Sequence, residues 1–196
     1  LIGGGHDYFT RRKDGRNLVN EFTRNGYAYL QDVESIRAFD GNKLIALTAP
    51  RANGRLQTRG DMLPVSTETA IRTLQKHENG FFLMVEGSFI DSGGHANNTI
   101  QIVEEVLDLD RAIGKALDFA AEDGRTLIVV LADHETGGMT LLGGSYETGM
   151  VKGEYTTGGH SGVMTPVFAY GPGACLFTGI MDNTDIHAKI SQLLIK

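Results

Sequence analysis

The sequence predicts an α/β protein in which a largely parallel sheet is flanked by helices. Short apolar runs at residues 43–49, 81–85 and 126–132 have the length and the bulky composition of buried strands. Amphipathic stretches lie between these runs, and polar residues follow two of them, as is usual at the carboxyl edge of a parallel sheet. The chain has 196 residues, of which 41% are hydrophobic, enough for a domain with its own core, and we treat residues 1–196 as a single domain.

Strand and helix patterns alternate in the first half of the chain. Leu1 and Ile2 precede three glycines and resemble the tail of a strand, so we expect the chain to be the later part of a longer protein, with any signal peptide before it. Ser66 or Thr67 can cap a helix. The expected elements are a helix at 16–25, a strand at 27–30, a helix at 32–39, a strand at 43–49, a polar surface segment at 50–64, a helix from 66 to 77 and a strand at 81–85.

The second half is predicted to begin with one long helix. Asn97 or Asn98 caps it, an apolar stripe runs to about Asp123, and Gly124 ends it. Residues 126–132 carry the strongest strand signal, whereas residues 137–159 are Gly-rich and predict neither a helix nor a strand of any length. A short strand at 166–171 and a terminal helix from about 182 to 194 follow. The sheet is incomplete without further strands, and its open edge predicts self-association.

Charge and composition exclude several classes of function. The formal net charge is −6 and the basic residues are scattered, so no nucleic-acid-binding face is expected. Arg51, Arg55 and Arg59 are interpreted as parts of a solvated loop. No apolar run approaches the roughly 18 residues of a membrane span. Cys175 is the one cysteine, which excludes an internal disulfide and leaves the redox compartment undecided.

Acidic residues and histidines gather in three Gly-containing segments near the apolar runs. Taken singly, each has an ordinary explanation as a solvated acid or a turn residue, and His77 and His187 lie in expected helices and are read as structural. Together they form the Asp and His ligand set of zinc sites that keep an open position. One tetrahedral zinc needs fewer ligands, which suggests two or three ions. The candidates are Glu86, Asp91 and His95, then Asp133 and His134, and then His160.

Three motifs contain the candidate ligands. They are Val85-Glu86-Gly87-Ser88 with Ile90-Asp91 and Gly94-His95, then Ala132-Asp133-His134-Glu135-Thr136-Gly137-Gly138, and then Gly159-His160 followed by residues 166–173. With these motifs the chain resembles the C-terminal portion of an alkaline phosphatase. The resemblance extends over nearly the whole chain and implies an alkaline-phosphatase-like α/β fold.

The resemblance implies two zinc ions and one magnesium ion per full-length subunit. A hard cation such as magnesium suits a carboxylate ligand. By motif, the first zinc would take Asp91, His95 and His160, the second zinc would take Asp133 and His134, and magnesium would take Glu86.

The implied activity is hydrolysis of phosphate monoesters through a phosphoserine. The family's serine nucleophile lies in its N-terminal part, which this chain lacks, so Ser88, Ser92 and Ser161 are not assigned that role. We therefore expect the isolated chain to have little or no activity. A periplasmic or extracellular location and a possible homodimer rest on the family alone. The alternatives are a related phosphodiesterase, phosphomutase or sulfatase, and a non-catalytic metal-binding module.

Overall fold

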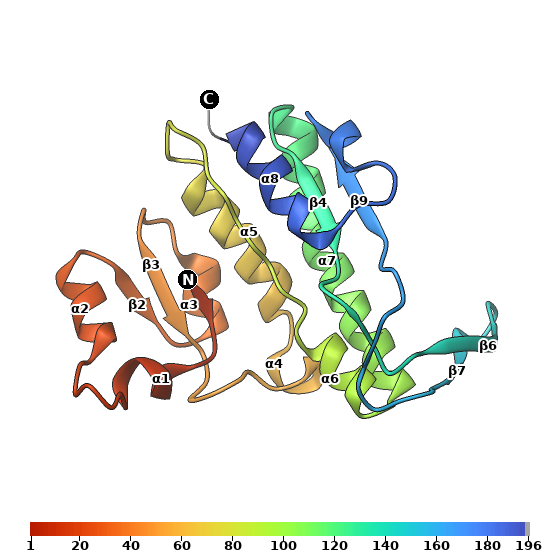
Figure 1. Ribbon diagram of the computed structural model, residues 1–196. Helices are drawn as coiled ribbons and strands as arrows, with labels where there is room; N and C mark the ends of the chain where they lie inside the picture. The colour runs from red at the N-terminus through yellow and green to blue at the C-terminus, as the bar shows by residue number, and fades with distance from the viewer. Residues whose placement is uncertain (195–196) are drawn as a thin grey trace. The chain divides into compact units, whose positions relative to one another are not determined.

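The computed structural model describes residues 1–194 and divides the chain into two compact units (Figure 1). The first unit consists of residues 1–87 and 105–115, and the second of residues 88–104 and the chain from residue 116 onwards. The long helix α7, Thr99–Asp123, contributes residues to both units. The predicted α/β class is confirmed, although the strands are short.

A three-stranded parallel sheet forms the centre of the first unit. The strands β1 (Ile2–Gly3), β2 (Ala28–Leu30) and β3 (Leu44–Leu47) lie in the order β1-β3-β2. The strands predicted at 27–30 and 43–49 are thereby confirmed. Because β3 is central, all four of its residues are buried, as the unbroken apolar run Leu-Ile-Ala-Leu requires.

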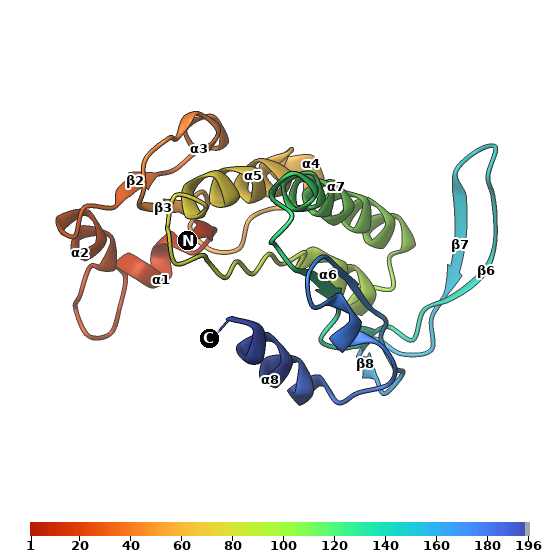
Figure 2. The ribbon, with the colours of Figure 1, turned by 90° about the horizontal axis from the view of Figure 1, so that it is seen from above.

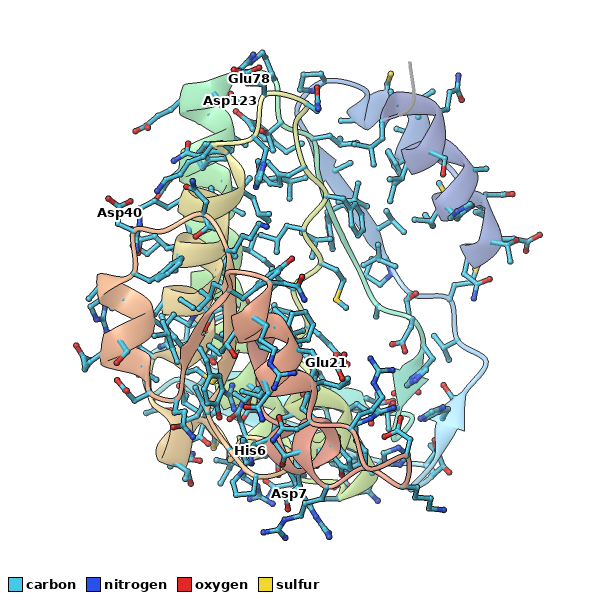
Figure 3. The ribbon with its side chains drawn as sticks, turned by 90° about the vertical axis from the view of Figure 1, so that its left-hand side faces the viewer. His6, Asp7, Glu21, Asp40, Glu78 and Asp123 are labelled. Atoms are coloured by element: carbon cyan, nitrogen blue, oxygen red, sulfur yellow. The ribbon has the colours of Figure 1, made fainter. Side chains whose placement is uncertain are left out.

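Helices cover both faces of this sheet (Figures 1 and 2). On one face Ile36 and Val65 pack with Leu44 and Ala46, and on the other Val19 packs with Ile45 and Leu47. Asp40, labelled in Figure 3, accepts a hydrogen bond of 2.7 Å from Lys76 Nζ and ties two helix ends together. The helices are α1 (His6–Thr10), α2 (Leu18–Arg24), α3 (Val33–Ala38), α4 (Leu56–Arg59) and α5 (Met62–Leu74).

The segment at 50–64 differs from the expected solvated loop. It contains α4 and the start of α5, so Ser66 and Thr67 lie inside a helix and do not cap it. The Arg59 side chain is only 9% exposed, and its guanidinium donates to the carboxylates of Glu105 and Asp108, the latter at 2.6 Å. The loop prediction was wrong for Arg59 because a guanidinium can be buried where carboxylates pair with it, and these partners lie far away in the sequence. Arg51 and Arg55 are exposed, as predicted.

Residues 81–85 form no strand among the described residues, although their apolar run predicted one. Exposure alternates along the segment: Phe82 and Met84 are largely exposed, and residues 81, 83 and 85 are half-buried. A strand requires a neighbouring backbone to accept and donate its hydrogen bonds, and an apolar run cannot by itself supply that neighbour. The predicted buried strand is thus wrong in this structure.

The second unit combines helices with short antiparallel strand pairs. Helix α6 (Phe89–His95) precedes α7, which is capped by the Asn98 side chain and ends at Gly124, as predicted. Strand β4 (Ile128–Leu131) pairs antiparallel with β9 (Val167–Tyr170), which confirms both strands. The parallel arrangement expected of the sheet thus holds for β1, β2 and β3 and not for this pair.

A hairpin occupies the Gly-rich segment that was predicted to lack strands. Strands β6 (Thr140–Ser145) and β7 (Met150–Glu154) pair antiparallel and extend away from the other elements of their unit (Figure 2). The glycines interrupt the alternation of apolar and polar residues that would have indicated strands. Gly149 has a positive φ of 67°, which the turn of the hairpin requires. The unit is completed by β5 (Glu135–Thr136), β8 (His160–Ser161), the 3₁₀ helix η1 (Ala174–Phe177) and α8 (Asn183–Leu194).

None of the helices in the described chain combines the length and the apolar character needed to cross a membrane.

Candidate metal centre

Helix α6 carries the first two candidate ligands one turn apart. Asp91 and His95 are spaced i and i+4, so their side chains lie on the same face of the helix. The His95 Nε2 atom lies 3.5 Å from Asp91 Oδ2. Both residues were expected in a Gly-rich loop, and the structure places them on a helix instead.

Two glycines inside α6 let this helix approach its neighbours. A Cβ atom at Gly94 would lie 2.8 Å from the Thr136 carbonyl oxygen of β5, and one at Gly93 would lie 2.9 Å from Ile102 Cγ1 of α7. Any side chain at Gly94 would collide with a backbone atom that cannot move independently. Gly94 therefore serves the close packing of α6 against the strand that follows His134, and Gly93 serves its packing against α7.

Asp133 and His134 follow β4 directly, as the sequence predicted. The Asp133 carboxylate is largely exposed, and its Oδ2 lies 3.3 Å from His134 Nε2. These two residues therefore offer an oxygen and a nitrogen donor side by side. His134 leads straight into β5, which pairs with β8 and so connects this segment to His160.

Strand β8 brings His160 to the other two histidines. Its Nε2 lies 3.2 Å from His95 Nε2 and 3.6 Å from Asp91 Oδ1. Its ring also stacks on that of His134, with centroids 3.5 Å apart and planes inclined by 21°. Helix α6 and strand β8, which carry these side chains, can be followed in Figure 2.

Hydrogen bonds to the Nδ1 atoms define the tautomers of two histidines. His95 Nδ1 lies 2.7 Å from the Gly158 carbonyl oxygen, which can only accept, so Nδ1 carries the proton. Thr136 Oγ1 gives its single proton to Asp91 Oδ1 at 2.6 Å, so His134 Nδ1, 3.1 Å from the same hydroxyl, must donate to it. In the neutral rings of His95 and His134, Nε2 is consequently left with a free lone pair.

The converging atoms fit a divalent cation of the zinc type. Donor atoms of Asp91, His134 and His160 all lie within 4.8 Å of one another. Two ligand atoms bound at about 2.0–2.1 Å to one tetrahedral zinc are about 3.3 Å apart. The separations of 3.2, 3.5 and 3.6 Å among His95, His160 and Asp91 are close to that value, with the two Asp91 distances measured to different carboxylate oxygens. This second set contains His95 in place of the His134 of the first. Neutral imidazoles with protonated Nδ1 and a carboxylate are the donors such an ion prefers.

Glu135 is the residue that sequence reasoning missed at this site. Its carboxylate accepts hydrogen bonds from the Ser161 hydroxyl and from the backbone amides of Met139 and Gly138, and these bonds lower the pKa of the Glu135 carboxyl. In the sequence, Glu135 was noted only as a member of the motif at residues 132–138 and was given no role. Its position directly after His134, matched by a serine directly after His160, is the signal that could have indicated its role.

The structure brings together five of the six predicted ligands. Glu86 is exposed and belongs to the first compact unit, so its participation stays a prediction. His77 and His187 are exposed and lie away from the predicted motifs, the first beyond the end of α5 and the second within α8. The five residues of the second unit are Asp91, His95, Asp133, His134 and His160.

These features define an α/β protein with a candidate metal centre built from imidazoles and carboxylates. A family model described as alkaline phosphatase matches residues 1–152. Alkaline phosphatase 3 of Bacillus subtilis is 30% identical over 99% of this chain and 57% of its own length. The chain therefore belongs to the alkaline phosphatase family.

Solved structures of the family agree with this assignment. The alkaline phosphatase of the Antarctic bacterium TAB5 is 41% identical, with a TM-score of 0.86 over 98% of this chain and 59% of that one. A variant of the TAB5 enzyme, solved with Mg bound in its M3 site, is 40% identical with a TM-score of 0.85 over the same shares of the two chains. The chain thus spans a little over half the length of these relatives.

Proposed function

We propose that the full-length protein is a metal-dependent hydrolase of phosphate monoesters that acts through a phosphoserine. The proposal concerns the full-length protein because this chain spans only a little over half the length of its relatives. Membership of the alkaline phosphatase family supports this reaction class. The single observation that carries the proposal is the convergence of the His95 and His160 Nε2 atoms, 3.2 Å apart, beside the Asp91 carboxylate. Such a group of lone pairs is stabilised by a cation.

The proposal assigns two zinc ions and one magnesium ion to the full-length subunit. When bound, the ions would supply positive charge for the oxygens entering and leaving phosphorus. Magnesium bound in the M3 site of the TAB5 variant supports the magnesium assignment. The assignment is Asp91, His95 and His160 for the first zinc, Asp133 and His134 for the second, and Glu86 for magnesium.

The residues of this chain orient the donors. The Nδ1 hydrogen bonds of His95 and His134 place the lone pair of the neutral ring on Nε2 and restrict rotation of the ring. The Thr136 hydroxyl connects His134 to Asp91, so the strand ligand and the helix ligand share one hydrogen-bond chain. Pre-orientation of this kind reduces the conformational entropy that binding would otherwise cost.

We also propose that the isolated 196-residue chain has little or no phosphatase activity. The family's serine nucleophile falls outside the motifs that this chain shares. Ser161 is already engaged as a donor to Glu135, which is unsuitable for a nucleophile that must be activated by a base or a metal. An extracytoplasmic location and a homodimer are proposals that rest on the family alone.

Metal content tests the proposed centre. Protein purified without chelators is analysed for zinc and magnesium per chain, with the His160→Ala variant beside it and the exposed helix residue His187 replaced by Ala as the matched control. We expect about one zinc per chain, lost in His160→Ala and retained in His187→Ala. Equal zinc in both variants, or none in the wild-type chain, would contradict the assignment of the first zinc.

Substrate preference tests the reaction class. The full-length protein should hydrolyse aryl phosphate monoesters much faster than the matching diester and sulfate ester, whereas the 196-residue chain alone should hydrolyse none of them measurably. Faster turnover of the diester or the sulfate ester would favour a related phosphodiesterase or sulfatase. Turnover of none of the three by a full-length protein that binds zinc would favour a non-catalytic metal-binding module.

A further inference from the structure

One carboxylate connects the two segments that carry His134 and His160. Glu135 Oε2 accepts hydrogen bonds from the Ser161 hydroxyl and from the Gly138 amide at 3.0 Å, and Glu135 Oε1 accepts one from the Met139 amide at 3.1 Å. We call this group, Glu135 with Ser161 and the two amides, the Glu135 clamp. It belongs to none of the predicted ligand sets.

A short strand pair and three flanking backbone hydrogen bonds join these two segments: the Gly137 amide donates to the Gly159 carbonyl, and the Thr156 and Thr157 amides donate to the Gly137 carbonyl. Strands β5 and β8 contain two residues each, and the β6–β7 hairpin with its flanking turns lies between them in the chain. An isolated two-stranded pair is at best marginally stable, and here the loop that must be closed is long. Side-chain bonds across this pair therefore matter more than they would in a large sheet.

The register places the clamp and the histidines on opposite sides of the strand pair. Glu135 is opposite Ser161, and Thr136 is opposite His160. Because successive residues of a strand alternate between its two faces, the Glu135–Ser161 bond lies on one face and Thr136 with His160 on the other. His134 precedes Glu135 and stacks on His160, with ring centroids 3.5 Å apart.

We infer that Glu135 is a positioning residue: its bond to Ser161 maintains the register of β5 and β8 and so sets the relative position of His134 and His160. A carboxylate that accepts three hydrogen bonds suits this task, since charge-assisted bonds are stronger than neutral ones. The consequence for metal binding rests on the proposed function, whereas the positioning of the two rings does not.

The first arm of the test uses the metal-free chain and the ring signals of its histidines in NMR spectra. The variants are Glu135→Gln, Ser161→Ala and the double variant, with Glu154→Gln, an exposed carboxylate on β7, as the control. Each substitution will disturb the histidine next to it in the sequence, His134 for Glu135→Gln and His160 for Ser161→Ala. The effect on the histidine of the other segment is therefore decisive. We expect Ser161→Ala to shift the His134 signals and Glu135→Gln to shift the His160 signals, with His187 unchanged throughout. Absence of both cross-effects in folded variants would overturn the inference.

The second arm measures the affinity of the same proteins for Co²⁺ alone, followed by its visible absorption. Residues that orient metal ligands typically contribute about 10- to 100-fold to affinity. We expect each single variant to lose Co²⁺ affinity to this extent and Glu154→Gln to keep the wild-type affinity. The double variant should bind Co²⁺ no less tightly than the single variant with the lower affinity. Unchanged Co²⁺ affinity in both single variants would overturn the inference.

The two arms separate failure of the clamp from failure of the proposed metal centre. A wild-type chain that binds no Co²⁺ but shows both cross-effects supports the clamp and contradicts the first zinc site. A wild-type chain that binds Co²⁺ but shows neither cross-effect supports the metal centre and contradicts the clamp.

Discussion

Thr136 Oγ1 donates a hydrogen bond of 2.6 Å to Asp91 Oδ1, which joins β5 to α6 across 45 residues of sequence. The same hydroxyl accepts the proton of His134 Nδ1 at 3.1 Å. One threonine thus orients a carboxylate of the helix and an imidazole of the strand end. Its removal should affect ligands that the sequence assigns to two different metal ions.

Thr136→Val tests this connection, since valine keeps the shape of threonine and removes the hydroxyl. We expect zinc affinity to fall about 10- to 100-fold, because Asp91 and His134 both lose the partner that orients them. The measurement is a competition titration of zinc against a chromophoric chelator. Thr148→Val, at an exposed hairpin position, should leave the affinity unchanged. Equal zinc affinities of the Thr136→Val and wild-type chains would show that the hydroxyl does not orient Asp91 and His134 for metal binding.

Gly94→Ala should destabilise the protein. The added Cβ would meet the Thr136 carbonyl oxygen at 2.8 Å and force α6 away from β5, at a cost of about 1–3 kcal/mol. The matched control is Gly114→Ala in α7, where nothing lies within 4 Å of the added atom and alanine should stabilise the helix by about 0.5–1 kcal/mol. Urea unfolding followed by circular dichroism measures both. Gly94→Ala with unchanged or increased stability would refute the close approach of α6 to β5.

Arg59→Met should be strongly destabilising. The exposed fractions of the Glu105 and Asp108 side chains are 1% and 0%, so removal of the guanidinium leaves the buried Glu105 carboxylate without the cation that pairs with it and leaves Asp108 with Arg111 alone. Breaking a buried pair by removing one partner typically costs about 3–5 kcal/mol. Arg55→Met, four residues earlier and exposed, should change the free energy of unfolding by less than about 0.5 kcal/mol. Similar unfolding midpoints for the two variants would contradict the burial of Arg59.

Asp14 should titrate at an unusually low pH. The Arg12 guanidinium hydrogen-bonds to its carboxylate, the Arg16 amide adds a second bond, and together they lower the pKa of Asp14 from 3.8 to about 2. Because the folded-state pKa is the lower one, the stabilisation is fully present above pH 3.8 and is lost as the pH falls through about 2. NMR titration of the carboxyl carbon measures the midpoint. In Arg12→Gln the midpoint should rise toward 3.8, and a midpoint near 3.8 in the wild type would contradict the bond.

Local sequence signals predicted much of the fold. The Asn98 cap and the Gly124 stop depend on residues that interact within a few positions of one another. The run 44–47 was recognisable from its unbroken apolar composition, and in the structure it pairs with β1 and β2. A strand at 81–85 would depend instead on a distant backbone for pairing, whereas the hairpin strands β6 and β7 pair with each other. The apolar run at 81–85 has no partner strand in the described part of the chain, so the strand predicted there does not form. The Gly-rich segment, for which no strand was predicted, forms a hairpin because its two halves pair with each other.

The sequence by itself determined which residues could bind a metal, because the identity of a donor atom is a property of the side chain, and the resemblance to alkaline phosphatases implied how they would be grouped. Only the tertiary structure decided their arrangement. The pairing of His95 Nδ1 with Gly158, of Thr136 with Asp91 and of Glu135 with Ser161 joins segments 26 to 63 residues apart. Hydrogen bonds depend on distance and direction to within fractions of an ångström, and such precision arises only once the separate segments have packed together.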